Sequence, residues 1–136
     1  MSLDSWRFWV FVAGISGIVV VGAGAYGYHT LPDDPKVRNA FEIAVQYHMF
    51  HTLALFAVAW LRKSGGDERS AYWAIRSGWF FLAGILMFSG SLYTFCLTGT
   101  NPIPSGAPIG GGMFLAAWAM LTWSVIRKSG LSKSDN

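Results

Sequence analysis

The side chains best suited to chemistry stand close together in the apolar segment 41–61, which contains Glu42, Gln46, His48 and His51. His48 and His51 are three residues apart, so on a helix one turn separates the two imidazoles and both could bind one metal ion. Such a site needs further ligands, and the other long apolar segments carry no carboxylate or thiol at that depth. We therefore expect no metal site, and a role for His51 in handling protons or a ligand stays open.

A haem would need axial ligands on facing helices. The third histidine, His29, ends the first apolar segment and so lies about a third of a membrane thickness away from His51. No stretch of the chain has the pattern of a nucleophile with its base, a phosphate-binding loop or a cofactor fingerprint. We expect no catalytic residue and no cofactor.

The structural interpretation of His51 is a neutral side chain that hydrogen-bonds to a neighbouring helix, because desolvation disfavours the charged imidazolium. Counting along two antiparallel helices brings His51 level with Phe88 and Ser89. Ser89 is therefore the expected partner, with Ser91 and Tyr93 as less favoured alternatives.

A second polar group surrounds the short turn at residues 31–35. His29 and Glu42 flank this turn and should lie at the same depth, and Glu42 is one helical turn from both Arg38 and Gln46. We expect an interfacial polar cluster that fixes the hairpin. A substrate site or a lipid-headgroup site is the alternative.

The elements that position these residues follow from composition. The chain has 136 residues, of which 53% are hydrophobic and only 12% are charged, and no Asp, Glu, Lys or Arg occurs between residues 77 and 126. A soluble domain of this size could not bury so much apolar surface. The composition excludes a disordered chain, a nucleic-acid-binding protein and a secreted disulfide scaffold, and it indicates a single integral membrane domain over residues 1–136.

Four segments are long and apolar enough to span a bilayer: 8–28, 41–61, 77–98 and 108–126. They are too long and too continuously apolar for the strands of a membrane barrel. The connections are short, and Asp34 followed by Pro35 is typical of a helix start. The sequence therefore predicts an all-α protein with four transmembrane helices in an up-down-up-down bundle.

The distribution of basic residues predicts the orientation of this bundle. Eight Lys and Arg residues lie on the side that holds both termini and the second connection, whereas only Lys36 and Arg38 lie on the other side. Basic residues accumulate on the cytoplasmic side of membrane proteins. Both termini should be cytoplasmic.

Cysteine labelling in intact cells tests this orientation. Segments 32–38 and 100–107 should be outside, so Ser105→Cys should react with a membrane-impermeant reagent and Ser2→Cys should be protected. The reverse labelling pattern would invert the topology.

Small residues predict where the helices pack closely. Gly17, Gly24 and Gly27 follow one side of the first segment, and small side chains let transmembrane backbones approach. We expect the first helix at the centre of the bundle, with a homodimer seam as the alternative, so Gly17→Leu or Gly24→Leu should damage assembly more than Val19→Leu. Two further glycines at the start of the fourth segment should mark another close contact: Gly110 and Gly111.

Five short stretches together resemble a known family: residues 24–31 (GAYGYHTL), 41–51 (FEIAVQYHMFH), 88–93 (FSGSLY), 98–99 (TG) and 108–112 (PIGGG). They are similar in type and order to the motifs of the small inner-membrane family typified by bacterial YgdD, a family of unknown function with small transmembrane relatives in animals. Tyr28 stands where that family usually has alanine. The resemblance implies four helices in a bacterial inner membrane and transfers no activity.

The sequence favours a non-enzymatic multi-pass protein that serves as an accessory, assembly or stability subunit of a larger membrane complex. Its expected partners are membrane lipids and either a membrane protein or further copies of itself, but no nucleic acid. The alternative is a small oligomeric transporter, channel or lipid-binding protein that uses the polar residues of the second helix. A redox protein is a third class, which a visible absorption spectrum would detect.

Overall fold

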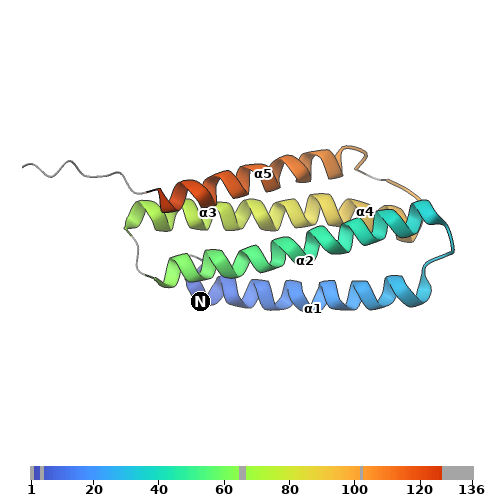
Figure 1. The fold of residues 1–136 in the computed structure, drawn as a ribbon, viewed down its shortest axis with the longest axis horizontal. Coiled ribbons are helices and arrows are strands. Elements are labelled where there is room, and N and C mark those ends of the chain that lie inside the picture. Colours follow the sequence, from blue (N-terminus) through green and yellow to red (C-terminus); the bar gives the residue numbers. More distant parts are fainter. Residues whose placement is uncertain (1, 4, 65–66, 102, 127–136) are drawn as a thin grey trace, which may run out of the picture.

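The computed structural model describes residues 2–3, 5–64, 67–101 and 103–126, and every regular element in these ranges is helical. The elements, in chain order, are α1 (Trp6–Thr30), α2 (Pro35–Lys63), α3 (Glu68–Gly84), the π-helical turn η1 (Ile85–Ser89), α4 (Gly90–Thr98) and α5 (Gly106–Val125). α3, η1 and α4 run on without a break and form one span. The four spans run up and down alternately (Figure 1), which confirms the predicted bundle.

Local sequence explains where the helices begin and end. Asp34 accepts a hydrogen bond from the backbone N–H of Lys36 at 2.8 Å, with Pro35 at the first helical position. Asp67 caps α3 in the same way, through the N–H of Ser70. α4 ends at Gly99, whose φ of 68° lies in the left-handed region that favours glycine.

All four spans are apolar and long enough to cross a membrane, by length and composition. Each predicted span lies within its helix except that the last prediction extends one residue beyond α5. The helices are longer than the predicted spans because polar turns at their ends continue the helical hydrogen bonding, as at the start of α2 and α3.

The second span is the central one. α2 packs against both α1 and α3, and α3 packs against α5 (Figure 1). In the most apolar stretch of each helix, 44% of the residues of α2 are buried but only 17% of those of α1. The expectation that the first helix occupies the centre is therefore wrong.

The glycines of α1 show why that expectation failed. The buried positions of α1 follow one seam: Trp9, Ala13, Ser16, Val20 and Gly27. Gly27 is on the seam, where an added Cβ would lie 2.6 Å from Cδ1 of Phe41, whereas Gly17 meets no atom within 4 Å and Gly24 only Val45 at 3.8 Å. Gly17 and Gly24 lie beside the seam, so they are not the close-packing positions that their spacing suggested.

The closest approach between helices is where α5 begins. A Cβ on Gly110 would lie 2.8 Å from Cα of Phe88 in η1, and a Cβ on Gly106 would lie 2.7 Å from Cβ of Ser91. Gly111 is at ordinary contact distance, 4.0 Å from Cδ2 of Phe88. The start of α5 thus lies directly on the backbone of the π turn, and Gly110 rather than Gly111 permits it.

Candidate functional site

A buried polar network joins three helices in the interior of the bundle. His48 of α2 is at its centre, with Nε2 3.0 Å from Oγ of Ser16 in α1 and Nδ1 3.3 Å from the hydroxyl of Tyr93 in α4. Ser16 also lies 2.6 Å from Oγ1 of Thr52, one turn further along α2. Ser16, His48 and Thr52 are at most 9% exposed, so these contacts are made away from the lipid.

Each member of this network can both donate and accept a hydrogen bond, and each has a partner. Buried polar groups that are fully paired stabilise one arrangement of the helices, because breaking the pairs leaves costly unsatisfied groups. The network therefore holds α1 and α4 to α2. Ser16 and Thr52 were missed in the sequence, although Ser16 stands on the buried seam of α1 and Thr52 one turn from His48.

The expected bond between His51 and Ser89 is wrong. Nδ1 of His51 lies 2.7 Å from the carbonyl oxygen of Tyr47 in its own helix. Ser89 donates instead to the carbonyl of Ala44 at 2.9 Å, and Ser91 donates to the carbonyl of Phe88 in η1. The prediction assumed an unbroken α-helix opposite α2, whereas the π turn η1 changes the register there.

The His51 ring packs most closely on α5, and it also contacts Phe81 of α3 at 5.7 Å between ring centroids. Its ring stacks on Phe114 with 3.5 Å between centroids and 3° between planes. Next to it, Tyr47 stacks on Phe88 at 4.5 Å and 22°. These rings form part of the wall of a groove of about 720 Å³ between α2 and α5, which we name the α2–α5 groove. Its lining residues are Gln46, Tyr47, Met49, Phe50, His51, Leu53, Phe88, Gly111, Phe114, Leu115 and Trp118.

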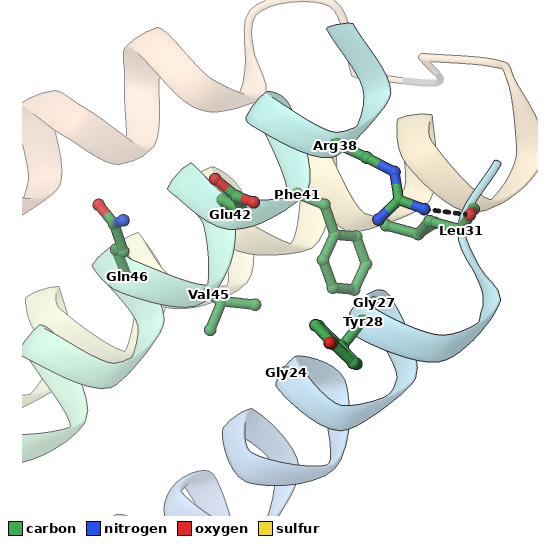
Figure 2. A pocket seen from close by; sticks show the side chains of 9 residues that line it. All are labelled: Gly24, Gly27, Tyr28, Leu31, Arg38, Phe41, Glu42, Val45 and Gln46. Carbon is green, nitrogen blue, oxygen red and sulfur yellow. Dashed lines mark hydrogen bonds between the residues drawn. The ribbon is translucent and has the colours of Figure 1, made fainter. Parts of the chain in front are cut away.

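A smaller pocket of about 250 Å³ lies between α1 and α2 near the turn that joins them (Figure 2). Arg38 lines it and donates from Nη2 to the carbonyl of Leu31 at 3.1 Å, while Nε lies 3.4 Å from a carboxylate oxygen of Asp33. Glu42 and Gln46 line the same pocket. The Arg38 side chain therefore ties the start of α2 to the end of α1.

His29 is not among the residues that line this pocket, and its exposed ring contacts Tyr28 instead. The structure thus places five of the eight candidate residues in three separate sites, while His29, Ser89 and Ser91 belong to none of them. His48 and Tyr93 belong to the buried network, His51 to the α2–α5 groove, and Glu42 to the pocket, with Gln46 shared by groove and pocket. Among the described residues, no three His, Cys, Asp or Glu side chains converge on a point that could hold a metal ion.

The network makes a direct prediction for His48. We expect His48→Leu to lower the free energy of unfolding by about 1–2 kcal/mol, because Ser16 and Tyr93 lose their partner inside a membrane protein. His48→Gln should lose less, since an amide can still donate and accept. Thermal unfolding in detergent measures both, with exposed Gln46→Leu as control. Equal melting temperatures for the Leu and Gln variants would contradict a structural role for the network.

Comparison with known proteins shows that the chain is similar to one family of membrane proteins. The family model described as "Protein of unknown function (DUF423)" matches residues 23–111. The "UPF0382 membrane protein YwdK" of Bacillus subtilis is 34% identical over 126 residues, which cover 89% of this chain and 98% of the relative. The "UPF0382 inner membrane protein YgdD" of Escherichia coli K12 is 35% identical over 126 residues, covering 89% of this chain and 91% of the relative. No solved structure matches significantly.

Proposed function

Because the chain belongs to the DUF423 family, whose relatives in Bacillus subtilis and Escherichia coli are named membrane proteins, we propose that it is an accessory or assembly subunit of a larger membrane complex. This chain is a multi-pass membrane protein. The Escherichia coli relative is named an inner membrane protein, which indicates a bacterial inner membrane for this chain as well. In this proposal the protein has no catalytic activity and acts by contact with another membrane protein.

The observation that carries the proposal is that His48 and Ser89, two polar residues inside the bundle, are paired within the protein. A channel or transporter for ions needs polar groups that are free to face the solute along a path through the membrane. Here His48 is engaged by Ser16 and Tyr93, and Ser89 is engaged by the backbone of α2. These groups already serve to hold the bundle together, which favours a protein that acts through its outer surface.

The outer surface has the character that lateral association within a membrane requires. α1 exposes a row of apolar side chains to the surroundings, among them Ile18 at 72% and Val21 at 74%. Large aromatic side chains are exposed on α2 as well, such as Trp60 at 66%. Lipids can cover such surfaces, and so can the apolar helices of a partner, because association in lipid is driven by packing.

Purification from native membranes under mild conditions tests the proposal. We expect one membrane protein to copurify in a fixed stoichiometric ratio and to lose stability in cells that lack this chain. A homo-oligomer with an aqueous path along its axis would contradict the accessory role. Measurable turnover of a substrate by the purified chain would contradict its non-enzymatic nature.

The α2–α5 groove favours a second candidate function, the binding of a lipid-soluble molecule. The groove opens between two neighbouring spans and is lined mainly by apolar and aromatic side chains. Small-molecule sites typically have this composition, with a few polar groups that fix the orientation of the ligand. The polar groups among the lining side chains are the amide of Gln46, the hydroxyl of Tyr47, the imidazole of His51 and the indole N–H of Trp118.

A further inference from the structure

His51 presents a hydrogen-bond acceptor that the protein itself does not use. Its Nδ1 is 2.7 Å from the carbonyl oxygen of Tyr47. Because a carbonyl can only accept, Nδ1 carries the hydrogen and the neutral ring presents Nε2 as an acceptor. Among the described residues, Nδ1 has the hydrogen bond of His51 and Nε2 has none. The residue is 4% exposed, but Nε2 is not one of the fully buried atoms without a partner, so this atom is open toward the groove that His51 lines.

The position of His51 makes this free acceptor unusual. The residue lies near the middle of α2, which spans Pro35–Lys63, and so near the middle of the membrane. An unpaired polar group there has no water to bond with, and a buried polar group without a partner costs free energy. Since His51 lines the α2–α5 groove, a molecule in the groove can provide the missing donor.

The walls of the groove fit a flat ring. The stacked pair His51–Phe114 and the stacked pair Tyr47–Phe88 stand side by side, and Trp118 lies 6.3 Å from His51 between ring centroids. Aromatic rings pack favourably against further aromatic rings in offset or edge-to-face arrangements. The volume of about 720 Å³ lies within the range of small-molecule pockets, about 300–1,000 Å³.

We propose that the α2–α5 groove binds a lipid-soluble aromatic alcohol of the phenol or quinol class, whose hydroxyl donates a hydrogen bond to Nε2 of His51. The aromatic ring packs among the rings of the groove, and an apolar tail extends along Leu53 and Leu115 toward the lipid. A phospholipid fits less well, because its polar groups lie at the membrane surface and its acyl chains have no donor at this depth. The inference rests on the second candidate function and gives its ligand a chemical class.

The test uses an octylphenol with bromine at the end of its chain and the methyl ether of the same compound, which lacks the donor. Each is titrated into the full-length protein in lipid nanodiscs, and quenching of tryptophan fluorescence is measured. Trp118 lines the groove, so the quenching lost in Trp118→Phe reports binding there. We expect saturable quenching by the phenol, with the ether binding at least about fivefold more weakly, as expected for the loss of one hydrogen bond.

His51→Phe provides the matched variant, because phenylalanine keeps a ring against Phe114 but has no acceptor. It should bind the phenol as weakly as the ether, while its affinity for the ether stays unchanged. The comparison of the two ligands on the wild-type protein decides the matter even if this variant folds poorly.

Every other outcome overturns the proposal, and each one contradicts a different part of it. Equal affinity for phenol and ether would leave a lipid-binding groove but remove the role of the hydroxyl. Quenching that does not saturate, or that is unchanged in Trp118→Phe, would remove the groove as a binding site altogether. Cross-linking of a partner's helix to Leu115→Cys in native membranes would assign the groove to a protein instead.

Discussion

Gly110→Ala is expected to prevent normal assembly of the bundle. The added methyl group would lie 2.8 Å from Cα of Phe88, and it would meet the backbone nitrogen of the same residue even more closely. A neighbouring side chain could change its rotamer to make room for the methyl group. The backbone of η1 cannot move in this way, because it continues into α3 on one side and into α4 on the other. Overpacking of this kind typically costs about 1–3 kcal/mol, and this site should lie at the upper end because the neighbouring atoms are backbone. Yield in the membrane fraction and melting temperature in detergent measure the effect.

Gly112→Ala is the matched control on the same helix. A Cβ on Gly112 meets no atom within 4 Å, so the same substitution two residues away should be tolerated. Replacing glycine by alanine inside a helix also favours the helical state slightly. If both variants had the same stability as the wild type, α5 would not lie on the π turn as closely as described.

Trp9→Ala should destabilise the protein by about 3–5 kcal/mol, the usual cost of removing a large aromatic side chain from a packed core. Trp9 is fully buried and its ring fills the space over Gly78 of α3, where an added Cβ would lie 2.6 Å from Cη2. Phe8 and Trp79 surround the same ring with centroid distances of 5.2 and 5.3 Å. Removing the indole leaves a cavity between α1 and α3. The resulting loss of stability is measured as a lower melting temperature.

Trp60→Ala is the control for the size of the substitution. Trp60 is 66% exposed, so its removal should change stability by less than about 1 kcal/mol. The contact between Trp9 and Gly78 allows a further test. Gly78→Ala should lower the stability of the wild-type protein but lower it less in the presence of Trp9→Phe, because the effects of substitutions at contacting residues are not additive. Similar losses for Trp9→Ala and Trp60→Ala would contradict the central place of Trp9.

The helices could be predicted from the sequence because the membrane imposes their length and composition. A span needs about 20 apolar residues, and uncharged runs of that length are visible directly in the chain. The start of α2 was also predictable, since Asp34 and Pro35 act through local backbone chemistry. Such features depend on neighbours in sequence, so they do not require knowledge of the three-dimensional packing.

The partners of the site residues could not be predicted in the same way. Both histidines of α2 are buried, yet His48 bonds across to two helices while His51 bonds to its own backbone. Which partner each histidine finds depends on the rotation of each helix about its axis. The pattern of apolar residues in a membrane span says little about that rotation, because nearly every face of the span is apolar. The hydroxyl of Ser16, which completes the network, lies on a helix whose glycines suggested a different face.

The π turn η1 also divides the third span into two α-helices, α3 and α4, whose side chains are rotated relative to one another about the common axis. The N–H of Gly90 bonds to the carbonyl of Ile85, five residues back, so η1 holds one residue more than an α-helical turn would. Deleting one residue from Ile85–Ser89 would restore a regular helix and swivel α4 by about 100° relative to α3. Tyr93 would then leave His48, and Ser91 would leave Gly106. The number of residues in η1 therefore sets the orientation of α4 relative to α3, so an insertion or deletion there would rotate all side chains of α4 at once.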